Sequence, residues 1–184
     1  MEEGHRNILL ETASVSLRHG VEHGGALVVD VADYDEPLQR LQASFVTLRE
    51  NGGSLRGCMG SSRALRPLIQ DVALNAYAAG FLDSRFGPVE EEELGGLDIH
   101  ISVLSDLDEM VFDSEEELLS QVRRGVDGLL LQEGERRGTL LPSVWQMISD
   151  PRVFLHELKS KAGLDPDYWS EGVRMFRYTT ESIR

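Results

Sequence analysis

The sequence of 184 residues is poor in cysteine, with Cys58 as its single example. One cysteine cannot close an internal disulfide, so Cys58 is available as a free thiol or thiolate. No stretch approaches the roughly 18 consecutive apolar residues of a membrane span. Residues 1–5 also lack the basic start and the apolar core of a signal peptide. We therefore expect a protein of the cytoplasm.

Positive charge is also scarce. The chain has 18 Lys and Arg against 32 Asp and Glu, a formal net charge of -14. Such a chain repels a phosphate backbone, because nucleic-acid binding depends on basic side chains that release counterions. Nucleic acid is therefore not an expected partner. The hydrophobic fraction of 41% and charged fraction of 27% are those of a globular protein, long enough for one domain with two lobes.

Sequence signatures of metal and cofactor sites are missing as well. There is no second cysteine, and the five histidines show no close metal-ligand spacing. His19 and His23 are four residues apart, but we expect Gly20 to interrupt the helix that would align them. The chain has no glycine-rich phosphate loop, no dinucleotide fingerprint and no serine elbow. The residues therefore indicate no metal and leave the cofactor unknown.

Helical periodicity marks several stretches of the chain. Apolar side chains recur at helical spacing in residues 5–19, 67–80 and 151–162. Gly20 can end the first helix, and Pro67 and Pro151 suit the first turns of the other two. A short helix is predicted after Ser114, because Ser114 and Glu117 have the spacing of a capping box.

Strand patterns lie between these helices. Residues 97–103 alternate apolar and polar side chains, as in a strand with one buried face. Two hairpins are predicted, one over residues 45–56 with its turn at 51–53 and one over residues 128–141. Residues 175–180 have strand character and should return to the main sheet. We therefore predict an α+β fold, mainly an antiparallel sheet flanked by helices.

The segment Leu55–Gly60 is the most informative part of the sequence. Gly57 and Gly60 let the backbone turn tightly and let a ligand approach, and Arg56 places a cation near Cys58. A nearby cation favours the thiolate, the reactive form of cysteine, which makes Cys58 a candidate nucleophile. The alternative is that Cys58 is a small buried hydrophobe and that the glycines only shape a turn.

Six strings occur in the order FVTL, LRGCMG, DSRF, LDIHISVL, LLPSV and KAGL, and Trp169 follows the last of them. Together they resemble the AMME syndrome candidate gene family, whose bacterial and archaeal members are often called AmmeMemoRadiSam system protein A. The resemblance runs from about Phe45 to Trp169. Met59 stands where the family usually has Ile, an apolar replacement that preserves volume.

The resemblance implies two unequal lobes, with both termini in the larger lobe and Leu55–Gly60 near the cleft between the lobes. The family's biochemical role is not settled, and its name reflects association with a Memo-like protein and a radical S-adenosylmethionine protein. Two hypotheses follow. The chain is a cytosolic enzyme, or an enzyme component, that uses Cys58, or it is a non-enzymatic interaction module for one of those two partners.

The matched strings add further candidate residues. Arg85 could bind a carboxylate or phosphate through two hydrogen bonds, although a contact with Asp83 that stiffens the loop is the simpler interpretation. Lys161 matches the family's late lysine and complements the negative end of a helix. His100 could act as a general base toward Cys58, although an exposed strand histidine is the simpler case. The candidate catalytic residues are Cys58, Arg56 and Arg85, and the candidate ligand-binding residues are Leu55, Gly57, Met59, Gly60, Asp83 and Lys161.

Overall fold

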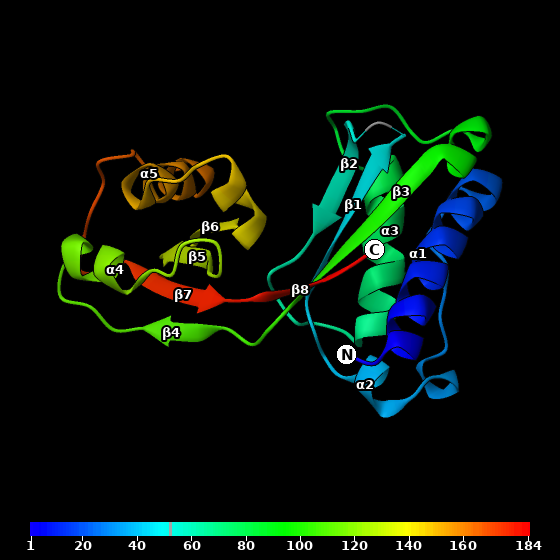
Figure 1. Cartoon of the computed structure of the whole chain (residues 1–184), viewed down its shortest axis with the longest axis horizontal. Coiled ribbons are helices and arrows are strands. Elements are labelled where there is room, and N and C mark those ends of the chain that lie inside the picture. The colour runs from blue at the N-terminus through cyan, green and yellow to red at the C-terminus, as the bar shows by residue number, and fades with distance from the viewer. Residues whose placement is uncertain (52) are drawn as a thin grey trace. The chain divides into compact units, whose positions relative to one another are not determined.

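The computed structural model in Figure 1 describes residues 1–51 and 53–184. The chain forms two compact units: unit 1 contains Met1–Leu104 and Glu181–Arg184, and unit 2 contains Ser105–Thr180. Unit 1 is the larger and holds both termini, as expected for the larger lobe. Gly52, at the predicted turn of the first hairpin, lies outside the described residues.

Unit 1 is built on a four-stranded sheet with strand order β2-β1-β3-β8. Its strands are β1 (Ser44–Glu50), β2 (Leu55–Gly60), β3 (Leu97–Leu104) and β8 (Thr180–Ile183). Its helices are α1 (Glu3–His23), α2 (Glu36–Gln39) and α3 (Leu68–Phe81), with 3-10 turns η1 (Val31–Asp33) and η2 (Glu91–Gly96). Strand β1 pairs antiparallel with both β2 and β3. The predicted first hairpin and the predicted strand at 97–103 are therefore confirmed.

Helices α1 and α3 lie side by side on one face of this sheet (Figure 1). Side chains of β1 point alternately to the two faces of the sheet, and the apolar ones face the helices. Val46 and Leu48 are fully buried against the helices, whereas Thr47 is only half-buried. Leu9 of α1 and Ile69 of α3 belong to the same buried cluster. This cluster is the core of unit 1 and lies between the sheet and the two helices.

A buried carboxylate joins α3 to β1. Asp71 accepts hydrogen bonds from the backbone N of Ser44 at 2.8 Å and from its Oγ at 2.7 Å. Asn75, one helical turn later, donates to the same carboxylate at 2.8 Å. Burial raises the pKa of Asp71, and the hydrogen bonds from Ser44 oppose that rise. The network fixes the start of β1 against α3.

Glycines allow close helix contacts in unit 1. At Gly57 a side chain would overlap the backbone carbonyl of Ala79, so α3 packs directly on β2. At Gly20 a side chain would likewise overlap the ring of Phe81. Gly20 lies inside α1, not at its end. Helix α1 continues to His23 and ends at Gly24, whose φ of 71° is left-handed. The prediction that Gly20 ends the helix was wrong.

Unit 2 contains a second four-stranded sheet, with strand order β4-β7-β5-β6. Its strands are β4 (Asp108–Met110), β5 (Gly128–Glu133), β6 (Arg136–Leu140) and β7 (Arg174–Tyr178), and its helices are α4 (Glu115–Gln121) and α5 (Pro151–Lys161), with the 3-10 turn η3 (Pro142–Gln146). The pairings β4–β7, β7–β5 and β5–β6 are antiparallel. The prediction for residues 175–180 was therefore half right, because β7 joins this second sheet and β8 joins the sheet of unit 1.

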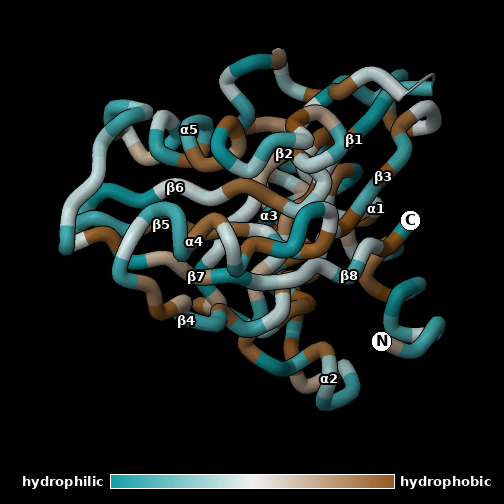
Figure 2. Tube along the Cα trace, turned by 60° about the vertical axis from the view of Figure 1, so that its left-hand side comes forward, coloured by the Kyte–Doolittle hydropathy of each residue, from teal (hydrophilic) through white to brown (hydrophobic). Residues whose placement is uncertain are grey.

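The core of unit 2 lies between its sheet and α5. Phe154 and Leu158 of α5 are fully buried together with Leu131 and Met175 from the strands. At Gly138 in β6 a side chain would meet the backbone of α5, so helix and strand approach closely there. Both hydrophobic and hydrophilic residues occur along α5 in Figure 2, as one buried and one exposed helix face require.

We expect the substitution Gly57→Ala to destabilise the protein by about 1–3 kcal/mol, because the added methyl group overpacks the contact with Ala79. Urea unfolding measures this loss. Gly87→Ala is the matched control, since a methyl group there meets open space. Equal unfolding midpoints for the two variants would show that α3 does not depend on the absence of a side chain at residue 57.

Candidate functional site

Cys58 is a half-buried residue of β2, which is an edge strand of the unit 1 sheet. It lies opposite Thr47 in β1, and Thr47 lies opposite His100 in β3. The three side chains form a row on the sheet face opposite α3, because the neighbouring Gly57 points toward α3. We call this the Cys58 face. Thr47 Oγ1 donates a hydrogen bond to Cys58 Sγ over 3.2 Å.

A side chain accepts a backbone hydrogen bond at the outer edge of β2. The backbone N of Cys58 donates to Asp83 Oδ2 over 2.9 Å. Edge strands leave such N–H groups without a strand partner, and Asp83 supplies the acceptor from the loop that follows α3. Asp83 is only 7% exposed, so its carboxylate is held in a fixed position beside the thiol residue.

Arg85 binds the same carboxylate through two hydrogen bonds. Its Nε donates to Asp83 Oδ1 at 2.9 Å and its Nη2 donates to Oδ2 at 2.6 Å. These bonds hold the pKa of Asp83 well below its usual range. They also raise the pKa of Arg85. The Arg85 side chain is 56% exposed. It therefore stiffens the loop, as the simpler interpretation expected, and also presents a cation near Cys58.

Arg56 has a different environment from Arg85. Its Nε and Nη2 donate to the Glu93 carboxylate at 2.6 and 3.0 Å, and Nη2 also donates to the Pro88 carbonyl at 3.2 Å. The hydrogen bond with Glu93 raises the pKa of Arg56, which is only 7% exposed. Its guanidinium lies 6.0 Å from the Phe86 ring centroid and that of Arg85 lies 5.5 Å from it. Arg56 thus anchors η2 to β2, and its charge is already paired.

His100 lies in the row of the Cys58 face without touching the thiol. Thr47 occupies the strand between them, and two strand spacings amount to about 9.5 Å. Burial lowers the pKa of His100, and the charges of Arg184 and Arg49 lower it further. These effects favour the neutral imidazole, and the charge of Asp98 opposes them. Thr47, which sequence reasoning did not single out, is the side chain that contacts Cys58.

The apolar residues and glycines of β2 are divided between its two faces. Met59 packs against the core of unit 1, on the same side as Gly57. Gly60 lies on the Cys58 face, where a side chain would overlap the Phe45 ring and the backbone of β1. Leu55 is half-buried at the start of the strand. Packing therefore accounts for Gly57, Met59 and Gly60, which were candidate ligand-binding residues.

Lys161 is the last residue of α5 and is exposed in unit 2. The lysine with specific contacts is Lys159, two residues earlier. It is fully buried, donates to Glu115 Oε2 over 2.6 Å and lies 5.6 Å from the centroid of the Trp169 ring. Lys161 therefore belongs to a different unit from the other candidate site residues.

Two histidine rings stack on each other, but they are not part of a metal-binding group in the described residues. His19 and His23 lie on one uninterrupted helix with ring centroids 4.5 Å apart, which corrects the expectation for Gly20. Within residues 1–51 and 53–184, no group of three or more His, Cys, Asp and Glu side chains is arranged to hold a metal ion. In the same part of the chain, no helix has both the length and the apolar character to cross a membrane.

The model of the AMMECR1 family matches residues 10–183. The chain belongs to the AMMECR1 family. The match spans both units and includes all the candidate residues of the Cys58 face and its edge. It confirms the resemblance carried by LRGCMG and the other strings of the sequence.

Relatives and a solved structure agree with this membership. Protein SSO0193 of Saccharolobus solfataricus is 38% identical over 157 residues, 82% of this chain and 69% of the relative. A protein of Methanothermobacter thermautotrophicus is 37% identical over 153 residues, 81% of this chain and 78% of the relative. The crystal structure of the uncharacterised protein PH0010 from Pyrococcus horikoshii matches with a TM-score of 0.86 at 30% identity, covering 95% of this chain and 88% of that one.

The depressed pKa of Asp83 predicts a pH-dependent contribution to stability. A carboxylate whose pKa is lower in the folded state stabilises the protein above its unfolded pKa, about 3.9, and loses this effect as the pH falls below that value. We expect Asp83→Asn to cost about 1–2 kcal/mol at neutral pH, and less as the pH falls from about 6 to about 3. Urea unfolding of both proteins across this range measures the difference, and a constant difference would contradict the assignment.

Proposed function

We propose that the Cys58 face is the thiol-dependent site of a cytosolic enzyme, with Cys58 as nucleophile and Arg85 as the binder of an anionic group on the substrate. One observation carries the proposal. The carboxylate of Asp83 accepts hydrogen bonds from both the Cys58 backbone N and the Arg85 guanidinium. A nucleophile and an anion-binding group are thus held by one buried anchor, which is the preorganisation that catalysis requires.

The surroundings of the thiol support this assignment. The hydroxyl of Thr47 donates to Sγ, an interaction that strengthens when the sulfur is negatively charged. Cys58 is not fully buried, as access by a substrate requires. These features distinguish it from an inert core cysteine, which has neither a donor nor access.

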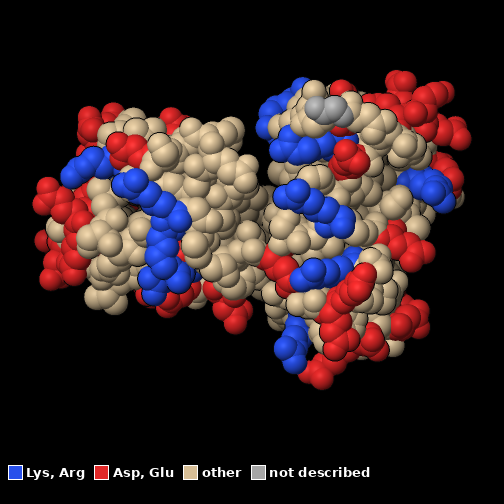
Figure 3. All heavy atoms as spheres, in the orientation of Figure 1, with Lys and Arg blue, Asp and Glu red and all other residues tan. Residues whose placement is uncertain are grey.

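The charge around the Cys58 face favours an anionic substrate. The charges of Arg49 and Arg184 reach His100 on this face together with the opposite charge of Asp98, and Arg85, paired with Asp83, lies at its β2 edge. Figure 3 shows basic side chains over the strands of unit 1, although the chain as a whole is acidic. A local positive potential attracts carboxylates or phosphates whatever the sign of the net charge.

The chemistry that fits these groups is attack by the thiolate on an electrophilic carbon. The sulfur electron pair forms the S–C bond, and the pair of the broken bond leaves with the leaving group or moves onto a carbonyl oxygen. Arg85 holds a carboxylate or phosphate of the same substrate through its exposed guanidinium. Arg56 keeps β2 and η2 together and does not contact the substrate in this scheme.

Alkylation with a matched pair of reagents tests the pairing of Cys58 with Arg85. Iodoacetate and iodoacetamide both form an S–C bond and release iodide, and they differ in negative charge. We expect the rate ratio of iodoacetate to iodoacetamide at Cys58 to fall about two- to fivefold in Arg85→Gln, since partly exposed charges interact by up to about 1 kcal/mol. Mass spectrometry of the peptide that contains Cys58 measures both rates.

The controls separate the local charge from a change in total charge. Arg85→Lys should keep most of the preference for iodoacetate. Arg6→Gln should leave the ratio unchanged, because Arg6 lies in α1 and pairs with Glu181. A Cys58 that resists both reagents in the folded protein, or a ratio insensitive to Arg85, would remove the proposed site.

Turnover distinguishes an enzyme from an interaction module. We expect a cell extract to lose a small anionic metabolite in molar excess over the added protein, and we expect Cys58→Ala to abolish this loss. Mass spectrometry of the extract before and after incubation measures it. Loss without dependence on Cys58 would contradict the nucleophile. An extract that stays unchanged, with tight binding of a Memo-like or radical S-adenosylmethionine protein that survives Cys58→Ala, would favour the module.

A further inference from the structure

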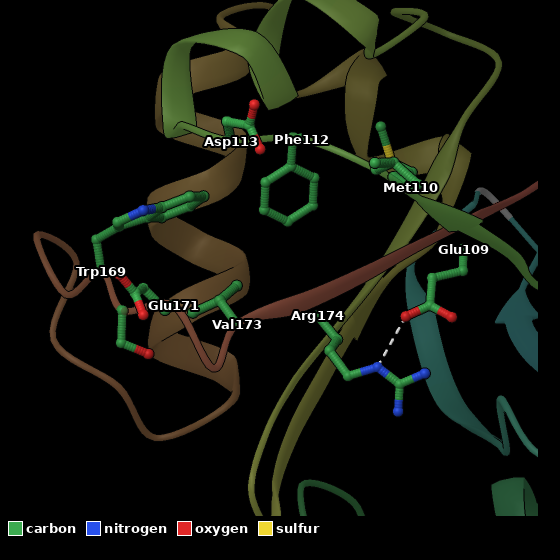
Figure 4. A pocket seen from close by; sticks show the side chains of 10 residues that line it. Glu109, Met110, Phe112, Asp113, Trp169, Glu171, Val173 and Arg174 are labelled. Carbon is green, nitrogen blue, oxygen red and sulfur yellow. Dashed lines mark hydrogen bonds and ion pairs between the residues drawn. The ribbon is translucent and has the colours of Figure 1, made fainter.

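Unit 2 contains a pocket of about 460 Å³ that is separate from the residues assigned above. Its volume falls within the range of roughly 300–1,000 Å³ that is usual for small-molecule sites. Two segments line it, residues 109–113 at β4 and residues 169–174 before and at the start of β7. Both segments belong to unit 2, so this unit forms the pocket by itself (Figure 4).

Aromatic rings form one part of the pocket. Phe112 and Trp169 have ring centroids 5.7 Å apart and tilted by 51°. The buried ammonium of Lys159 lies 5.6 Å from the Trp169 centroid, so α5 fixes this ring from the protein side. Val111, at the other segment, is 83% exposed. Figure 4 shows the rings of Phe112 and Trp169 close together at the pocket.

The charged groups of the pocket are mainly acidic. Among the described residues that line the pocket, Glu109, Asp113 and Glu171 supply three carboxylates and Arg174 supplies the basic side chain. Arg174 Nε donates to Glu109 over 2.8 Å, a bond that lowers the pKa of Glu109. Arg174 is thus engaged by one carboxylate. The Lys159 ammonium beside Trp169 is paired with Glu115. Asp113 and Glu171 are exposed, so they give the lining of the pocket a negative charge.

We propose that this pocket binds a small organic cation, an amine or a quaternary ammonium compound. Aromatic faces attract such cations through their quadrupoles and match their apolar surfaces. Asp113 and Glu171 add the opposite charge, and the rings exclude water from the cationic head. A metal ion does not suit the pocket, because the described carboxylates are not grouped for coordination. An anion would meet the carboxylates and be repelled.

Choline and 3,3-dimethylbutan-1-ol form a matched pair of probes, because they have nearly the same shape and differ in charge. We expect choline to shift the Trp169 indole signal in ¹H–¹⁵N spectra in a saturable manner, and the alcohol to shift it much less. Trp145 is an internal control, since its Nε1 donates to the Asp127 carbonyl and its ring stacks on Phe154. Putrescine tests whether primary amines share the site.

Variants locate the site. We expect Asp113→Asn and Glu171→Gln each to weaken choline binding about two- to fivefold, as loss of an exposed charge beside a cation–π contact predicts. Glu135→Gln, in the exposed turn between β5 and β6, should leave it unchanged. Trp169→Leu, followed by the backbone amide signals of residues 109–113, should abolish it, and the two carboxylate variants keep the test decisive if that protein does not fold.

Three results would overturn the proposal. The first is the absence of saturable shifts with both choline and putrescine. The second is an equal response to choline and the neutral alcohol, which would make the pocket a simple apolar surface. The third is choline binding that is insensitive to both Asp113→Asn and Glu171→Gln. Binding of putrescine alone, with the same dependence on these carboxylates, would support the cation site and restrict it to primary amines.

Discussion

The direct contact of α3 with β2 at Gly57 is the constraint on which the Cys58 face depends. Because residue 57 has no side chain, the α3 backbone at Ala79 lies against the strand. The helix ends at Phe81, so the loop that follows begins beside the outer edge of β2. Asp83 therefore reaches the Cys58 backbone. A bulkier residue at position 57 would move α3 outward and carry this anchor with it.

Two ion pairs then protect the same edge strand. Asp83 and Arg85 cover it at Cys58, and Glu93 and Arg56 cover it two residues earlier. Asp83, Arg85 and Glu93 all belong to the segment between α3 and β3. This one segment supplies the acceptor for the N–H at the strand edge and the partner for the buried Arg56 of β2. The pairs differ in exposure. Arg56 is enclosed, whereas Arg85 remains half-exposed, and only an exposed guanidinium can take a second anion.

Much of the fold could be predicted from local sequence patterns. The arrangement of the candidate site depends on contacts between residues that are distant in the sequence. The first hairpin, the alternating strand and α3 follow from turn residues and periodicity. The partner of Cys58 does not, because the register of β1 and β2 shifts between Leu48 and Arg49. A slip of one residue would move Thr47 to the other face. Gly20 was misjudged for a similar reason: its role is to admit Phe81, a residue 61 positions later.

Net charge was informative about the whole chain and misleading about its parts. A net charge of -14 argues against a polyanionic ligand. Yet Arg49 and Arg184 act on His100 of the Cys58 face, while Asp113 and Glu171 line the pocket of unit 2. Within a Debye length of about 8 Å the nearest groups determine the potential that a small ligand meets. The total charge of the chain therefore does not decide which small ligands its two proposed sites would select.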